Sequence, residues 1–123
     1  MDSNAKVAII GAGLMGHGLA LVHAIAGHAV KMTDISESQL ATGMELIASA
    51  LETLVAGGGV AKSETAAILA RIQPVATLKE AVADADFIVE AVVENREVKT
   101  KVYAELETAA PATAIVASNT SYL

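Results

Sequence analysis

The sequence predicts an α/β fold, a doubly wound parallel β-sheet with helices on both faces, and three observations support this prediction. Short apolar runs rich in Val and Ile alternate with longer segments of helical spacing, which is the pattern of repeated strand–helix–strand crossovers. A glycine-rich turn follows the first apolar run. Aromatic residues form only 2% of the chain, and this suits small aliphatic side chains packed between helices and a buried sheet.

In the first half of the chain, glycines and a capping signal separate the expected elements. Gly11 ends the first β-branched run, and Gly27 ends the apolar segment that follows it. Ser36 and Gln39 stand at capping-box spacing and predict a helix start. The expected elements are a strand Lys6–Ile10, a helix Leu14–Ala26, a strand Ala29–Asp34 and a helix from Ser36 to about Ala56.

The second half is expected to complete five strands. The elements are a helix capped by Ser63 and ended by Pro74, a weak strand Val75–Thr77, a short helix Leu78–Ala83, a strand Phe87–Val93, a helix Glu97–Ala109 and a strand Thr113–Ala117. The two helices on either side of the glycine triplet 57–59 predict a helical hairpin, about residues 36–73, inserted after the second strand. In the usual strand order 3-2-1-4-5-6, one domain of residues 1–123 would end before the sixth strand.

Charge and composition argue against several classes of partner. The net charge of −6 gives no basic field for DNA, RNA or anionic lipid. The chain has no cysteine, so it has no disulfide and no thiolate metal site, and we expect no metal. The apolar segment Val7–Ala26 is broken by glycines and histidines and has no positively charged region before it, so we expect no signal or membrane segment and a cytoplasmic protein.

The glycine-rich turn indicates a dinucleotide site. Residues 11–16 fit G-x-G-x-x-G between a predicted strand and a predicted helix, which is the context of the Rossmann-type fingerprint. Gly11 permits the tight turn, Gly13 lets the backbone approach a pyrophosphate, and Gly16 allows close packing of helix on strand. Leu14 and Met15 place their backbone N–H groups in the first helical turn, which faces the anion.

Asp34 narrows the cofactor to NAD. It ends the second strand about 20 residues after the glycine turn, where a carboxylate accepts hydrogen bonds from the adenosine ribose. This carboxylate would repel the 2′-phosphate of NADP, and Thr33, Ile35 and Ser36 offer no arginine in its place. The plain alternative is a glycine turn made only for packing, with Asp34 as a solvated strand end.

Further residues extend the pattern over almost the whole chain. The residues that carry it are the glycine turn, Asp34, the run FIVEAVVEN at 87–95, Lys99 and the run SNTS at 118–121. With these residues the chain resembles the N-terminal NAD-binding domain of the 3-hydroxyacyl-CoA dehydrogenase family. The resemblance implies that four residues lie by the cofactor: Glu94, Lys99, Asn119 and Ser121. It also implies that Ser121, as a catalytic residue, makes a hydrogen bond to the substrate 3-hydroxyl. The plain alternative makes Glu94 and Lys99 an exposed charge pair and residues 118–121 a capping turn.

The resemblance also implies an activity. Members of the family oxidise an L-3-hydroxyacyl-CoA to the 3-oxoacyl-CoA in fatty-acid or related acyl-CoA degradation, with hydride transfer to NAD. Their His–Glu base pair follows the SNTS loop, and it and the C-terminal helical domain are absent from these 123 residues. His17, His23 and His28 lie on or just after the first predicted helix, and we interpret them as structural. We expect this part alone to be inactive.

Two alternatives and a prediction about association remain. The family carries lysines for the coenzyme A phosphates around the helical hairpin, and here only Lys62 is present. A dehydrogenase of free hydroxy acids, such as gulonate, is therefore one alternative. Asn119 nevertheless favours the branch of the family that acts on thioesters. A non-catalytic NAD-binding module is the other alternative. The apolar run Thr113–Ala117 would form an uncovered sheet edge, and we therefore expect self-association, as a homo-oligomer.

Overall fold

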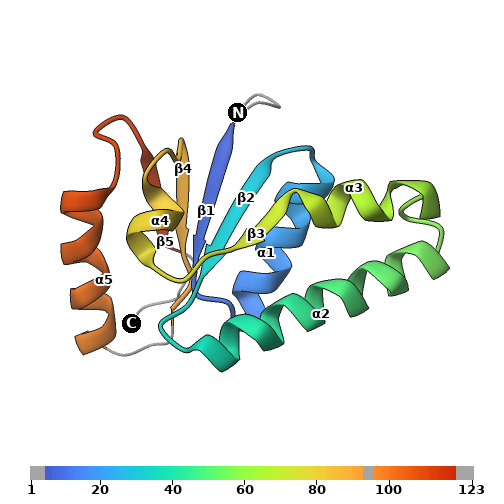
Figure 1. Ribbon diagram of the computed structural model, residues 1–123, viewed down its shortest axis with the longest axis horizontal. Coiled ribbons are helices and arrows are strands. Elements are labelled where there is room, and N and C mark those ends of the chain that lie inside the picture. The colour runs from blue at the N-terminus through green and yellow to red at the C-terminus, as the bar shows by residue number, and fades with distance from the viewer. Residues whose placement is uncertain (1–4, 93–95, 119–123) are drawn as a thin grey trace.

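The computed structural model describes residues 5–92 and 96–118 and places its strands in a single parallel sheet (Figure 1). The strand order is β3-β2-β1-β4-β5, with every neighbouring pair parallel. The strands are β1 Lys6–Ile10, β2 Ala29–Thr33, β3 Ile72–Pro74, β4 Phe87–Glu90 and β5 Ile115–Ser118. The predicted doubly wound α/β class and the first five positions of the strand order are confirmed.

Helices cover the two faces of this sheet. They are α1 Leu14–Ile25, α2 Glu37–Ala56, a 3₁₀ turn η1 Lys62–Glu64, α3 Thr65–Ala70, α4 Leu78–Val82 and α5 Arg96–Ala109. One hydrophobic cluster joins α1, α2 and α3 to the sheet, and a second joins α4 and α5 to the opposite face. The alternation of the strands divides the core in this way, because Val7 and Ile9 of β1 lie in the first cluster whereas Ala8 and Ile10 lie in the second.

The connection from β2 to β3 contains α2, η1 and α3, which extend beyond the sheet in Figure 1. Helix α2 begins as predicted, because the Ser36 side chain accepts a hydrogen bond from the Gln39 N–H at 3.2 Å. The predicted Ser63 cap is wrong. Ser63 lies inside η1, and α3 follows with Glu64 at its N-cap and no side-chain capping bond.

The third strand lies earlier in the chain than the sequence predicted. Ile72–Pro74 pairs with β2, and Val75, expected to start the strand, follows it with a buried side chain. Pro74 ends β3 rather than only ending a helix, and this is possible because β3 is an edge strand that tolerates a missing N–H. The fourth strand is shorter than predicted. It ends at Glu90, and the expected last residue, Val93, lies outside the described residues.

Candidate functional site

The candidate site lies at the carboxyl edge of the sheet, where four strands end in register. The last residues of these neighbouring strands lie opposite one another in the sheet: Thr33 of β2, Ile10 of β1, Glu90 of β4 and Ser118 of β5. The loops that follow these residues meet at one edge. In open α/β sheets this is the edge at which ligands bind.

The glycine loop after β1 has the close contacts that its motif predicts. Gly11 has φ +109°, and a Cβ there would come within 2.5 Å of the Ala91 carbonyl oxygen. A Cβ at Gly16 would overlap the Gly11 carbonyl oxygen, so helix α1 packs directly on the loop. A Cβ at Gly13 would meet open space instead. Gly11 and Gly16 therefore serve the fold, whereas the surface over Gly13 is open for a ligand.

Helix α1 begins directly at this open surface. Gly13 is its N-cap residue, and within the described residues no side chain caps the helix. Leu14 and Met15, in the first turn, are 82% and 55% exposed. The N–H groups of a first helical turn have no partner within the helix and carry a partial positive charge, so this end of α1 suits a phosphate group.

Asp34 follows β2 and is held in place by two backbone groups. Its Oδ2 accepts a hydrogen bond from the Ala12 N–H and its Oδ1 accepts one from the Ser36 N–H, both at 2.8 Å. Since Ala12 lies in the glycine loop and Ser36 caps α2, the carboxylate joins the two segments. Asp34 is only half-buried, so part of the carboxylate faces solvent beside the loop.

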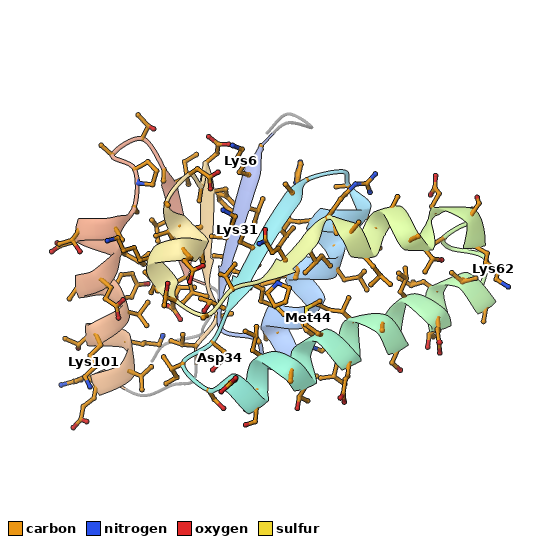
Figure 2. All side chains as sticks on the ribbon, viewed as in Figure 1. Lys6, Lys31, Asp34, Met44, Lys62 and Lys101 are labelled. Carbon is orange, nitrogen blue, oxygen red and sulfur yellow. The ribbon has the colours of Figure 1, made fainter. Side chains whose placement is uncertain are left out.

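A cavity of about 670 Å³ opens next to Asp34. Its lining contains both apolar and polar residues, from the loops and from α5. Among the lining residues are Asp34, Ile35, Thr77, Val92, Val98 and Lys101. Figure 2 shows Asp34 at the end of β2 and Lys101 on α5. A slot with apolar walls and a carboxylate at one end has the chemistry to hold an adenosine group.

The remaining predicted site residues are only partly described. Glu94, Asn119 and Ser121 lie outside the described residues. Lys99 is described, and its side chain is 10% exposed with Nζ 3.8 Å from Oε1 of Glu90. The plain alternative of an exposed Lys99 is therefore wrong, because this ammonium lies beside a fully buried carboxylate.

Glu90 is a residue of this edge that the sequence did not single out, although its position carries a signal. Glu90 is the single charged residue of β4 and its last residue, and an acid that ends a buried strand at the ligand-binding edge is unusual enough to examine. Its partners could not be predicted in the same way. Tyr103 and Ser118 donate to Glu90 from 13 and 28 residues away.

The three histidines make local contacts. Nδ1 of His17 makes a hydrogen bond with the Gly13 carbonyl oxygen at 3.0 Å. The Nδ1 atoms of His23 and His28 are hydrogen-bonded to each other at 3.1 Å. Burial and then the neighbouring His28 lower the pKa of His23 below its ordinary value. The His23 ring also contacts the ring of Phe87, the first residue of β4. The His23–His28 pair therefore lies at the amino edge of the sheet, away from Asp34.

Other expectations concern charge and the membrane. Lys62, the one lysine expected near coenzyme A, is exposed at the far tip of the α2–α3 connection in Figure 2, remote from Asp34. Among residues 5–92 and 96–118, no group of three or more acids or histidines is arranged to hold a metal ion. Within the same residues, no helix is both long enough and apolar enough to cross a membrane.

Comparisons with known proteins agree with this geometry. Residues 6–123 match the family described as 3-hydroxyacyl-CoA dehydrogenase, NAD binding domain. The chain is 39% identical to a probable 3-hydroxyacyl-CoA dehydrogenase of Caenorhabditis elegans, over 96% of this chain and 40% of that protein. It is 40% identical to a 3-hydroxybutyryl-CoA dehydrogenase of Bradyrhizobium diazoefficiens, over 94% of this chain and 39% of that protein.

Solved structures show the same similarity. The crystal structure of FadB2 from Mycobacterium tuberculosis matches with a TM-score of 0.92 and 34% identity, over 99% of this chain and 43% of that one. The chain thus spans about two fifths of the length of these three relatives.

Proposed function

Because the chain belongs to the 3-hydroxyacyl-CoA dehydrogenase family, as its NAD-binding domain, we propose that it is the cofactor-binding part of an NAD-dependent L-3-hydroxyacyl-CoA dehydrogenase. The parent protein would oxidise a 3-hydroxyacyl-CoA to the 3-oxoacyl-CoA. Its cofactor is NAD. The observation that carries the proposal is the Asp34 carboxylate, held beside an open glycine loop at the carboxyl edge of the sheet.

The residues at this edge fit NAD. The half-buried Asp34 has acceptor capacity left for ribose hydroxyls after its two backbone hydrogen bonds. The open surface over Gly13 and the exposed first turn of α1 suit the pyrophosphate. The neighbouring cavity, with Ile35 and Val98 in its lining, would accept the adenine. These groups come from the loops that follow β1 and β2 and from the first turns of α1 and α5.

The roles of the other site residues are part of the proposal. NAD supplies a hydride acceptor when it is bound. Lys99 and Glu94 would border its nicotinamide end, and Asn119 would contact the cofactor. Ser121 would hold the 3-hydroxyl of the substrate by a hydrogen bond, so that the carbon that gives up hydride faces the cofactor. These roles are supported by the family to which the chain belongs and, for Lys99, by its place beside Glu90 at the carboxyl edge.

The chain by itself should bind NAD without turnover. Removal of the hydroxyl proton needs a base oriented by a second group, as in a His–Glu pair. His17 is engaged by the Gly13 carbonyl, and His23 and His28 pair at the opposite edge. No described histidine is therefore placed to accept a proton from a substrate beside the glycine loop.

Calorimetric titration of the chain with NAD and NADP tests the cofactor site. NAD should bind more tightly than NADP by about tenfold or more, because the carboxylate of Asp34 repels a 2′-phosphate. Asp34→Asn should weaken NAD binding and reduce this preference, since one of the two oxygens that accept from the Ala12 and Ser36 N–H groups becomes an NH2 donor. The matched control is Asp84→Asn, an exposed acid bonded to Lys6 and Lys31. Equal affinity for the two cofactors, or equal loss in the two variants, would contradict the proposal.

A spectroscopic assay tests whether the chain alone can catalyse the reaction. The chain is mixed with NADH and acetoacetyl-CoA, and the absorbance of reduced cofactor is followed. We expect no turnover by the chain alone. Turnover would show that the proton-transfer residues lie within these 123 residues, whereas NAD binding without turnover also fits a non-catalytic module and requires the assay on the parent protein.

A free hydroxy acid is the second candidate substrate class, and one observation favours it. Helix α2 contains no lysine or arginine, and Lys62 lies at the remote tip of the connection that follows it. The phosphates of coenzyme A prefer cationic partners. Assay of the parent protein with 3-hydroxybutyryl-CoA and with free 3-hydroxybutyrate or gulonate distinguishes the two classes, and we expect the thioester to be the better substrate.

A further inference from the structure

Glu90 is a fully buried carboxylate with a complete set of partners. Its Oε2 accepts a hydrogen bond from the Val92 N–H at 2.9 Å. Its Oε1 accepts from the Tyr103 hydroxyl at 3.0 Å and from the Ser118 hydroxyl at 2.9 Å, and it lies 3.8 Å from Nζ of Lys99. The side chain of Glu90 has no exposed surface. No part of Glu90 can therefore touch a ligand directly.

These partners come from three segments of the carboxyl edge. Val92 belongs to the loop after β4, Lys99 and Tyr103 lie on α5, and Ser118 is the last residue of β5. The carboxylate of Glu90 therefore joins the β4 loop, residues 99 and 103 of α5 and the end of β5 at a single point.

Stability alone does not require a charge at this position. Taking a carboxylate out of water is costly, and well-packed apolar residues in place of a buried ion pair are often neutral or stabilising. Strand β4 is otherwise apolar, so an apolar residue at its end would continue the pattern. The charged network instead fixes the direction of polar groups, because each hydrogen bond to Glu90 has a defined geometry.

The position of the network relative to Asp34 indicates which half of the cofactor it faces. Asp34 follows β2, on one side of the glycine loop, and marks the adenosine ribose. Glu90 and Ser118 end β4 and β5, on the other side of β1. A dinucleotide that crosses the loop at this reversal of strand order places its second nucleotide half over β4 and β5.

We propose that Glu90 is a positioning residue for the nicotinamide half of the site. It holds the Lys99 ammonium in place and fixes the end of β5, from which the segment with Asn119 and Ser121 continues. The inference rests on the proposed NAD-binding function and adds a residue that acts without contact with cofactor or substrate. Loss of its charge should weaken the binding of ligands that carry nicotinamide and spare the binding of ligands that lack it.

The test compares two ligands on the same variant. Calorimetry gives the dissociation constants of NAD and of ADP-ribose, which keeps the adenosine, the pyrophosphate and the second ribose but lacks nicotinamide. In Glu90→Gln, one oxygen acceptor is replaced by an amide donor with nearly the same shape. We expect NAD affinity to fall by about tenfold or more, because a hydrogen bond to a charged group is worth at least about that factor, while ADP-ribose affinity changes little.

Two further variants provide a second test of the Glu90 network and a control. Tyr103→Phe removes one donor to Glu90 and leaves the carboxylate in place, so it should shift the ratio of the two affinities in the same direction by a smaller factor, and it decides the question if Glu90→Gln does not fold. Glu52→Gln, an exposed change on α2, should leave both affinities unchanged.

Each outcome has a defined meaning. Parallel weakening of NAD and ADP-ribose binding, or an unchanged ratio in both network variants, would overturn the positioning role. Failure of the wild-type chain to bind either ligand would instead overturn the proposed function.

Discussion

Gly43 of helix α2 is predicted to be essential to the packing of the glycine loop. A Cβ at this position would come within 2.6 Å of the Ala12 carbonyl oxygen, 3.0 Å of the Ala12 Cβ and 3.3 Å of the Met32 Cε. The first contact is with backbone, so it cannot be relieved by a change of rotamer. Since the Ala12 N–H is also a partner of Asp34, Gly43→Ala should shift both elements of the cofactor site.

The expected magnitude follows from two opposing terms. Alanine in a helix interior is favoured over glycine by about 1 kcal/mol. Overpacking against a rigid neighbour costs about 1–3 kcal/mol. Gly43→Ala should therefore lower the free energy of unfolding by about 1 kcal/mol in net terms and weaken NAD binding.

Gly18→Ala is the matched control. Gly18 lies in helix α1, and a Cβ there meets nothing within 4 Å. The propensity term then acts alone, and Gly18→Ala should raise the free energy of unfolding by about 0.5–1 kcal/mol. Thermal unfolding followed by circular dichroism should separate the melting temperatures of the two variants by about 5–8 °C. Equal stabilisation by both substitutions, with unchanged NAD affinity for Gly43→Ala, would refute the reasoning.

Three further predictions concern stability and association. Arg71→Met should lower the free energy of unfolding in urea by about 1–2 kcal/mol, because the guanidinium donates to the Ala24 carbonyl oxygen near the end of α1 at 2.8 Å. The pKa of His23 is lower in the folded chain than in the unfolded chain. The stability that His23 contributes is therefore complete above pH 6.5 and is lost as the pH falls below that value. Urea titrations at several pH values should show that the free energy of unfolding depends less on pH in His23→Gln. Val116, on the edge strand β5 and 43% exposed, should promote self-association. Light scattering should show less self-association for Val116→Lys than for the wild-type chain. A wild-type chain that stays monomeric at high concentration would disprove this prediction.

The elements that could be predicted from the sequence are those fixed by local chemistry. Gly11 was predictable because a strand followed at once by a tight turn needs a residue that adopts a positive φ. Asp34 was predictable because its spacing from the glycine turn is set by one helix and one strand. Ser36 caps α2 for a reason contained in four consecutive residues.

The features that the sequence did not predict depend on the arrangement of the sheet. Val75 has a higher strand preference than Gln73 or Pro74, yet the structure buries Val75 under α4 and pairs the two preceding residues with β2. Ser63 matches a capping pattern, but the 3₁₀ turn begins one residue earlier. Sheet register and helix packing decide such positions, and neither is contained in a short window of sequence.

Two carboxylates at the same edge of the sheet show why exposure, rather than residue type, separates a ligand-binding acid from a positioning acid. A carboxylate has about four acceptor positions. Asp34 uses two of them on backbone N–H groups and remains half-exposed, so hydroxyl donors of a ribose can reach it. Glu90 receives three hydrogen bonds and a neighbouring ammonium, and it has no exposed surface. Under the two proposals, the first acid would recognise the cofactor and the second would act only through Lys99 and Ser118. The ratio of NAD to ADP-ribose affinity is therefore the quantity that distinguishes the two acids.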